Sequence, residues 1–470
     1  MNKMVLLLVV AAGASAQPTG LLCDFQARTA LGVRSRPAFT WIVPAAPGAA
    51  DHKQLSYRIR VTAADGAAPM KVWDSGVVAS AASVGVPYTG AALPPGKAFN
   101  WTVQTTTSSS RSARLSTADA PHTAPPSEPA TFITALHAGF DASASYIWSP
   151  RGAKGIFAFV RKAVRRPASS VVRATAYISA ATDDYMLCGY KLYIAGKLVN
   201  VGPGRGEAPV WGGNGTYMEK AYSTLDVTGF LPPSGDILVA IQGLGSSGKG
   251  GAACAGSSPH GAPCAGFGPK MSVGVVMQLQ LETADGKTAT VGTDGTWDAF
   301  DATLYMKPKT GKNWYKHQLE HTDARMEPQG WRDSLRFKAA GPGWGKAKVV
   351  APAAGMVGLH AKMSRPVEVF DVPAASITVK DASSSLGKGW YLVDFGREFQ
   401  GGLRLEVESG VAGDSVAIDA GEARFQNCTK HRASCAPATD KVTSDWGYNF
   451  TWTLRDGSQK IEQHEYVRDL

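Results

Sequence analysis

The stretch QLSYRIRV at Gln54–Val61 alternates apolar and polar residues, and this two-residue period is that of a β-strand with one buried face. Two further short runs lie in the same region, VWDSGVV at Val72–Val78 and FNWTVQ at Phe99–Gln104. The turn-forming Pro94-Pro95-Gly96 precedes the last of them. Regularly spaced short strands with turns between them are typical of a β-sandwich. We therefore predict a small sandwich of the fibronectin type III kind over residues 17–135.

The strand pattern continues in a second region, for which we predict another β-sandwich over residues 136–360. The expected strands are Ala174–Ser179, Tyr190–Gly196, Ile237–Ile241 and Ser272–Leu281. The last of these is the most regular, with Val, Val, Met, Leu and Leu at every second position. The Gly-rich interval 243–268 cannot form a core by itself, and we expect a long loop there.

A third region contains two strand-like runs, Trp390–Gly396 and Gly402–Val407, separated by a Gly-Gly turn. These runs indicate a further sandwich over residues 361–470, which we expect the chain to contain only in part. A length of 470 residues suits about three domains. With Gly 52 and Pro 28, the composition favours strands and turns over long helices. The predicted fold class is all-β, with consecutive β-sandwich domains.

Between residues 105 and 129 the composition shifts to Ser, Thr, Ala and Pro. Such a composition is found in linkers and also in long loops between strands. Both interpretations remain open, and we expect the first domain boundary near Leu136.

The N-terminus has the three parts of a secretory signal peptide. Lys3 is basic, Val5–Ala12 is apolar, and Ala14-Ser15-Ala16 supplies small residues at a cleavage point. A membrane anchor would need about 20 apolar residues, and this run is much shorter. We therefore expect residues 1–16 to be a signal peptide, and the protein to be secreted, extracellular and without a membrane span.

The six cysteines are compatible with an oxidising compartment. Cys254 and Cys264 could close one local loop, and Cys428 and Cys435 another, which leaves Cys23 and Cys188 to pair or to remain free. No Cys-x-x-Cys spacing and no companion histidines accompany them, so we expect neither a metal nor another cofactor.

Four Asn-x-Ser/Thr sequons are glycosylation candidates, at Asn100, Asn214, Asn427 and Asn449. The net charge of +10 would ordinarily suggest nucleic acid as a partner. The basic residues are scattered, however, apart from Arg161-Lys162 and Arg165-Arg166, which we interpret as a solvated loop. No nucleic-acid partner is expected.

Several short strings resemble bacterial-type α-L-rhamnosidases of glycoside hydrolase family 78, and they occur in the same order as in that family. The first domain has YRIRV at Tyr57–Val61, VWDSG at Val72–Gly76, VPY at Val86–Tyr88 and WTV at Trp101–Val103. The second has AYIS at Ala176–Ser179, YKLYIAGK at Tyr190–Lys197, LDVT at Leu225–Thr228, TDGTW at Thr293–Trp297, Asp323-Ala324-Arg325 and Gly330-Trp331. The third has VDFGREFQG at Val393–Gly401, with Gly421-Glu422 downstream.

This resemblance implies a fibronectin-like domain, the jelly-roll sandwich of the rhamnosidase N-terminal domain and a concanavalin-like sandwich. It also implies a rhamnose-containing carbohydrate as the partner. In that family the catalytic carboxylates lie in a following α/α-barrel, which these residues do not include. No catalytic residue is therefore assigned, and the chain is expected to be the non-catalytic β-domain portion of such a hydrolase.

A Gly/Pro-rich loop at residues 202–211 is the candidate sugar-binding segment. Arg205, Glu207 and Trp211 bring together the aromatic and planar polar groups that contact sugars. The family's Asn-Gly and Gly-Asp pairs in the preceding hairpin are replaced here by Ala195-Gly196 and Asn200-Val201, which argues against a calcium-assisted site. A purely structural loop is the alternative.

A second titratable group comprises Glu320, Asp323 and Glu327, near His317 and His321. It could form a catalytic or metal cluster, but we favour a solvated or interface role, since this region lies between domains in the resembling family. Two other functions remain open for the chain as a whole. It could be a stand-alone secreted carbohydrate-binding or adhesion module, or a small hydrolase with a site among the sandwiches.

Overall fold

The chain folds into β-sheets, as predicted. The computed structural model describes residues 17–44, 50–64, 70–110, 121–137, 139–152, 157–182, 189–202, 221–244, 273–310, 318–350, 359–362, 365–380, 390–397, 399, 401–420, 423–426, 436–443 and 448–463. In these ranges the helices are short 3-10 turns, η2 (Thr228–Phe230), η4 (Ala302–Leu304) and η5 (Ala324–Met326). None of the helices described is long and apolar enough to cross a membrane.

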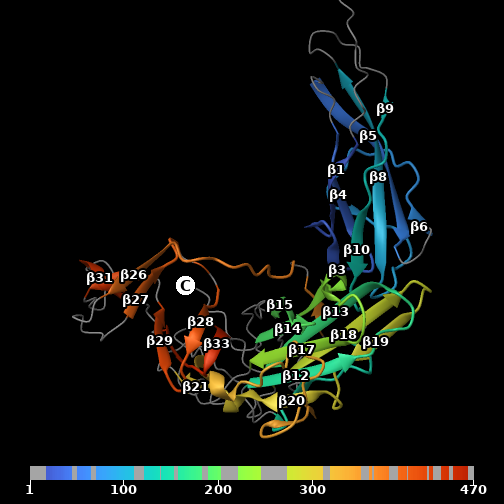
Figure 1. Ribbon diagram of the computed structural model, residues 1–470. Helices are drawn as coiled ribbons and strands as arrows, with labels where there is room; N and C mark the ends of the chain where they lie inside the picture. Colours follow the sequence, from blue (N-terminus) through green and yellow to red (C-terminus); the bar gives the residue numbers. More distant parts are fainter. Residues whose placement is uncertain are drawn as a thin grey trace, which may run out of the picture.

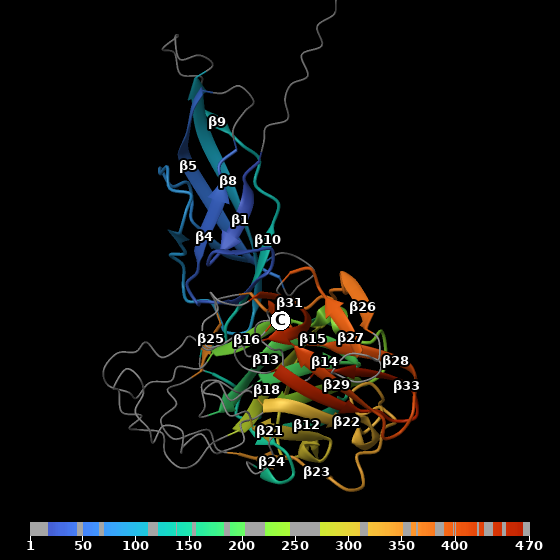
Figure 2. The same cartoon turned by 90° about the vertical axis from the view of Figure 1, so that its left-hand side faces the viewer.

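The first domain is a two-sheet sandwich that extends away from the rest of the molecule (Figures 1 and 2). One sheet has the order β2 (Gln26–Ala27), β1 (Thr19–Cys23), β4 (Ala38–Ile42) and β7 (Val86–Pro87). The other has β3 (Ala30–Val33), β10 (Ala130–Thr134), β8 (Ala98–Ser110), β5 (Ala50–Ala63) and β6 (Lys71–Asp74), with β9 (His122–Thr123) on β8. Phe39, Trp101 and Phe132 fill the space between the sheets, with the Phe39 and Trp101 rings 4.5 Å apart. This core explains the alternation of apolar and polar residues in Gln54–Val61, because Ile59 and Val61 are fully buried in it.

The Ser/Thr-rich stretch after Gln104 begins as a strand. β8 continues to Ser110, and Thr105 and Thr107 are buried. Thr106 and Thr107 pair with Thr123 and His122 of β9. Composition alone therefore suggested a linker or loop, whereas the β-branched threonines extend a strand. They do so because the long neighbouring strand β5 supplies backbone partners along this length.

The second domain is a larger sandwich. Its first sheet has the order β24 (Lys348–Val349), β11 (Ile147–Trp148), β18 (Val273–Thr283), β13 (Val171–Thr182), β16 (Ala221–Asp226) and β25 (His360–Ala361), with β19 (Thr288–Gly292) on β18. Its second sheet has β15 (Lys197–Gly202), β14 (Gly189–Ile194), β17 (Ile237–Leu244), β12 (Phe157–Val164), β20 (Asp298–Asp301) and β23 (Trp344–Lys346). Trp148, Met277 and Trp297 are fully buried between them. In the predicted alternation, the apolar side chains from Val275 to Leu281 all face this core.

The first and second domains meet in a polar junction around the predicted boundary at Leu136. The Tyr222 hydroxyl accepts a 2.7 Å hydrogen bond from the Leu136 backbone N–H and donates one of 3.2 Å to its carbonyl. Arg173 donates to the Ala64 carbonyl at 3.0 Å. Lys97 donates to the Thr288 hydroxyl at 3.2 Å. These contacts link backbone and side chains of both domains.

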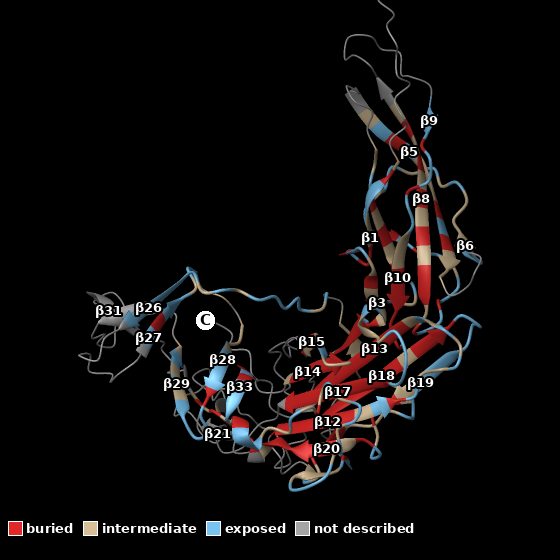
Figure 3. Cartoon of the chain, viewed as in Figure 1, coloured by how far each residue is buried: buried red, intermediate tan, exposed pale blue. Residues whose placement is uncertain are grey.

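The third region is built from smaller sheets. One has the order β21 (Met306–Thr310), β22 (Gln318–Asp323), β32 (Tyr448–Thr453) and β29 (Ser415–Ala420). The others are the pairs β26 (Ser376–Lys380) with β27 (Trp390–Asp394), β28 (Arg404–Gly410) with β33 (Gly457–Glu462), and β30 (Ala423–Gln426) with β31 (Ala436–Thr443). β21 and β22 precede residue 360, so strands on both sides of the second predicted boundary share a sheet. Figure 3 shows that β26, β28 and β33 carry many exposed residues, in contrast to the buried sheets of the second domain.

The two strands predicted on either side of Gly401-Gly402 both exist but do not pair with each other. β27 pairs with β26, and β28 pairs with β33. The glycines thus join separate two-stranded sheets and do not form a hairpin turn. The spacing of the two predicted strands could not reveal this, because β27 pairs with the preceding strand β26 and β28 pairs with the distant strand β33.

Candidate functional site

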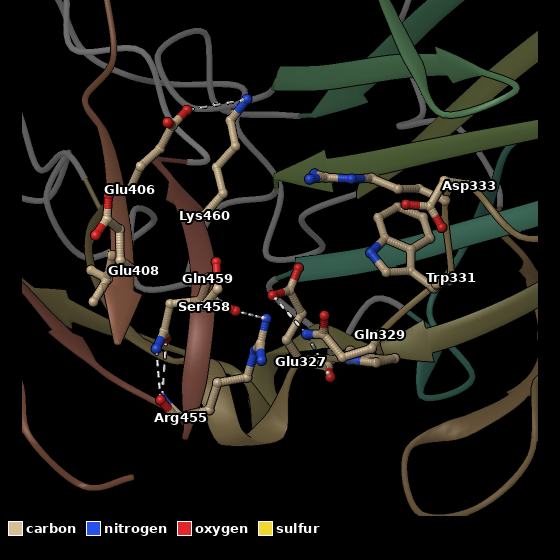
Figure 4. Close-up of a pocket in the computed structure, with 14 residues that line it drawn as sticks. Glu327, Gln329, Trp331, Asp333, Glu406, Glu408, Arg455, Ser458, Gln459 and Lys460 are labelled. Carbon is tan, nitrogen blue, oxygen red and sulfur yellow. Dashed lines mark hydrogen bonds and ion pairs between the residues drawn. The ribbon is translucent and has the colours of Figure 1, made fainter. Parts of the chain in front are cut away.

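A polar cleft of 510 Å³ lies between the second domain and the third region. One wall is the segment that follows η5, and the other is formed by β28, β33 and the turn before β33 (Figure 4). The lining residues are Glu327, Pro328, Gln329, Gly330, Trp331, Arg332, Asp333, Glu406, Val407, Glu408, Arg455, Ser458, Gln459 and Lys460. The two walls are far apart in the sequence, and the second is itself built from two separate segments, 406–408 and 455–460, so the cleft is a product of tertiary structure.

The first wall is held by an aromatic stack on the outer face of the second sheet. The Trp331 ring lies 4.3 Å from that of Phe159, with an angle of 4° between their planes. Arg161 donates hydrogen bonds of 2.8 Å and 2.9 Å to the carbonyls of Trp331 and Ser334. Buried aromatic and charge-assisted contacts of this kind fix a segment that has no regular structure of its own.

Arg161 therefore corrects the prediction that the basic cluster at residues 161–166 is a solvated loop. It belongs to β12 and is 4% exposed, and its guanidinium lies 5.0 Å from the centre of the Phe337 ring. A buried guanidinium needs several acceptors, and here the carbonyls of the cleft wall supply them. Charge spacing along the chain contains no sign of this role.

The second wall follows the alternation of two paired strands. Leu405 and Val407 contact a small core with Ile461, Trp452 and Ala324 of η5, so Glu406 and Glu408 point to the other face and are exposed. Because Ala324 comes from the η5 turn, this core also joins the two walls.

Cross-strand and turn contacts shape the same wall. Glu406 lies opposite Lys460, and their charged groups are 3.9 Å apart. Gly457 adopts φ +78° in the turn before them, a conformation that favours glycine. Gln459 donates to the Arg455 carbonyl at 2.6 Å and accepts from its N–H at 3.1 Å, which closes that turn.

Glu327 lies at the junction of the two walls and has a shifted pKa. Burial raises its pKa, and the nearby Glu462 carboxylate raises it further, while Arg332, the Gln329 amide and Arg455 oppose the shift. The Gln329 amide donates to the Glu327 carboxyl at 3.1 Å. Arg332 lies over the Tyr193 ring at 5.0 Å and 4.0 Å from Glu462, so it bridges the second domain and β33. The carboxyl of Glu327 is thus biased toward its neutral form.

Charges of both signs are intermixed in the cleft. Its lining includes the acids Glu327, Asp333, Glu406 and Glu408, and the cations Arg332, Arg455 and Lys460. The Arg455 Nε–H is buried without a hydrogen-bond partner in the described part of the chain. The arrangement can donate and accept hydrogen bonds along both walls.

The sequence-predicted sugar-binding residues Arg205, Glu207 and Trp211 lie outside the described residues, so their role stays a prediction. The same holds for Cys254, Cys264, Cys428, Cys435 and Cys188, and for Asn214 and Asn427. Cys23 is described, and it is a buried free cysteine.

Two sequons lie in described strands. Asn100 is half-buried in β8, where its side-chain oxygen accepts a 2.8 Å hydrogen bond from Thr131. Asn449 lies in β32. Glycosylation at either position stays a prediction.

The titratable group around Asp323 lies only partly in the described residues. Asp323 accepts two hydrogen bonds from the Arg325 guanidinium, at 2.9 Å and 2.7 Å, and one from its backbone N–H at the start of η5. Glu327 lines the cleft between domains. Glu320 lies in β22 opposite Pro308, and His317 is outside the described residues. No group of three acidic, His or Cys residues in the described ranges could hold a metal ion.

The sequence predicted Glu327 as a candidate titratable residue but gave no prediction for the residues of the second wall. Glu406, Glu408 and Lys460 occupy ordinary exposed positions of alternating strands, and nothing in their spacing distinguishes them from other surface charges. The Gly330-Trp331 pair was noted only as part of a resemblance, although Trp331 anchors the first wall.

Two family models match the chain in succession. The Rha78A-like, N-terminal immunoglobulin domain matches residues 18–136. The α-L-rhamnosidase N-terminal domain matches residues 169–371. Comparison with curated protein sequences yields no match.

Solved structures with a similar fold include three rhamnosidases. The α-L-rhamnosidase from Dictyoglumus thermophilum is 19% identical with a TM-score of 0.61, over 97% of this chain and 46% of its own. The enzyme from Aspergillus terreus is 21% identical with a TM-score of 0.61, over 96% and 46%. That from Streptomyces avermitilis, complexed with L-rhamnose, is 18% identical with a TM-score of 0.53, over 96% and 55%. This chain thus spans about half the length of these structures.

Proposed function

Because the chain contains the N-terminal immunoglobulin domain and then the N-terminal domain of α-L-rhamnosidases, we propose that it is the non-catalytic β-domain portion of a secreted glycoside hydrolase that acts on rhamnosides. The observation that carries this proposal is the succession of the two domains in one chain. These two matches agree with the resemblance of the short strings in the first and second domains, whereas the strings at residues 393–401 and 421–422 lie outside both matches.

The proposal assigns catalysis to a part of the enzyme that these residues do not span. Glycoside hydrolysis generally requires two carboxyl groups on either side of the scissile bond. Asp323 is held by Arg325, and Glu406 by Lys460 and Arg404. These acids thus have structural partners, as expected of a framework. The β-domains would position the catalytic domain and contact remote parts of the glycan.

Secretion is proposed from the sequence pattern at residues 1–16. The basic, apolar and small-residue segments appear in the order that signal peptidase substrates have. N-terminal sequencing of the mature protein tests this part directly. We expect the mature chain to begin at Gln17, and an intact Met1 would contradict the assignment.

Sequencing of transcripts beyond the codon for Leu470 tests the main proposal. An in-frame helical domain supports it, and the longer product should then release p-nitrophenol from p-nitrophenyl α-L-rhamnoside, while residues 17–470 alone should not. A stop codon directly after Leu470 would overturn it.

A stop codon would instead favour the alternative, a stand-alone carbohydrate-binding or adhesion module. The specific observation in favour of that alternative is the polar cleft, which needs no catalytic domain to bind a ligand. Hydrolysis by residues 17–470 alone would contradict both readings and indicate a hydrolase site among the sandwiches.

A further inference from the structure

The cleft between the second domain and the third region has the size of a ligand site. Its volume of 510 Å³ falls within the range of about 300–1,000 Å³ that small-molecule pockets usually have. Both walls are tied to packed cores, through Trp331 on one side and through Leu405 and Val407 on the other. The space is therefore bounded by fixed elements.

The charges of the lining select against an ionic ligand. An anion would meet the exposed carboxylates of Asp333 and Glu408, and a cation would meet Arg332 and Arg455. Lys460 lies 3.4 Å from Glu462 and 3.9 Å from Glu406, so its charge is already neutralised within the wall. A neutral ligand that offers both donors and acceptors avoids each repulsion.

The exposed polar groups of the two walls match a polyhydroxylated molecule. Gln329 and Glu408 are exposed on opposite walls. The Arg455 guanidinium is held by the Ser458 carbonyl at 2.9 Å and the Asp456 carbonyl at 3.3 Å, while its Nε–H has no partner in the described ranges. Because this Nε–H is buried, the exposed groups of Gln329 and Glu408 are the ones that a ligand can reach.

We propose that this cleft is a binding site for one neutral sugar residue of a rhamnose-containing glycan, held by Gln329 and Glu408. The identity of the sugar rests on the proposed function, whereas the preference for a neutral polyol rests on the cleft itself. The site would contact a part of the glycan remote from the bond that is cleaved. It is distinct from the predicted loop around Arg205, Glu207 and Trp211.

Calorimetry and saturation-transfer difference NMR on residues 17–470 test the proposal. The probes are L-rhamnose and methyl α-L-rhamnoside as neutral sugars, and D-glucuronate as an anionic one. The double variant Gln329→Ala/Glu408→Ala removes one exposed group from each wall. Arg336→Ala and Ser409→Ala are matched controls, because both residues are exposed near the walls but outside the lining.

We expect saturable binding of the rhamnosides, weakened at least tenfold in the double variant and unchanged in both controls, with D-glucuronate weaker than L-rhamnose. Absence of saturable rhamnoside binding, undiminished binding in the double variant, or stronger binding of D-glucuronate would each overturn the proposal. Circular dichroism and the urea midpoint establish that the variants are folded. Transcript sequencing decides the proposed function separately, so either conclusion can fail without the other.

Discussion

Replacing Tyr222 with Phe removes both hydrogen bonds that its hydroxyl makes to the backbone of Leu136, at the junction of the first and second domains. Tyr222 is 1% exposed and Leu136 is 7% exposed, so water cannot easily take the place of the hydroxyl. The Leu136 N–H is then a buried donor without its 2.7 Å partner.

The expected loss is about 2 kcal/mol. A buried polar group left unpaired costs about 1–3 kcal/mol, and the ring of Tyr222 keeps its packing because Phe has the same shape. Hydrogen exchange of a peptide that contains Leu136 should therefore accelerate by about thirtyfold, since about 1.4 kcal/mol corresponds to a factor of ten. The urea midpoint of the first two domains should fall while the slope of the transition is unchanged.

Tyr177→Phe is the matched control. Tyr177 is equally buried, its ring centre lies 6.2 Å from that of Tyr222, and its hydroxyl has no hydrogen-bond partner in the described residues. Removing that hydroxyl should leave stability unchanged or raise it slightly, because an unpaired buried group is lost. If Tyr177→Phe were as destabilising as Tyr222→Phe, the reasoning from hydroxyl pairing would be refuted.

Three further perturbations have defined outcomes. Burial raises the pKa of Glu327, so the contribution of the neutral Glu327 carboxyl to stability is complete at low pH and is lost as pH rises through that raised pKa. The urea midpoint of Glu327→Gln should therefore equal that of the wild type at pH 4 and be higher than that of the wild type at pH 7. The Arg58 guanidinium holds the pKa of Asp74 well below its ordinary value, so Asp74→Asn should lower the free energy of unfolding by about 1–2 kcal/mol at pH 7. The difference in unfolding free energy between variant and wild type should narrow as acid protonates the wild-type carboxylate. A constant difference from pH 7 to pH 2 would argue against this. Ile377 and Val379 are 62% and 66% exposed on one face of β26, and replacing both with Thr should reduce the fluorescence of bound anilinonaphthalene sulfonate; unchanged fluorescence would place the dye elsewhere.

Much of the fold could be predicted because strand alternation is a local property. The pattern in Gln54–Val61 and Ser272–Leu281 reports directly on which side chains enter a core, and Ile59, Met277 and Leu279 are fully buried as expected. The order of the family-like strings in the first two domains also agrees with the succession of the two matching family models. Composition was less reliable, since the threonines after Gln104 continue β8.

Of the residues that line the candidate site, only Glu327 was predicted from the sequence as a candidate functional residue. β28 pairs with β33, which follows it only after β29 to β32. The buried role of Arg161 depends on the carbonyls of Trp331 and Ser334, about 170 positions away. Long-range pairing leaves no periodic trace in a sequence, because each strand satisfies its own alternation whichever neighbour it meets.

The sequence by itself therefore determined the all-β class, the faces of the strands and the family to which the domains are similar. Only the tertiary structure decided which exposed charges face one another across the cleft. The physical reason is that apolar burial is encoded residue by residue, whereas a site between domains depends on how two completed cores are placed.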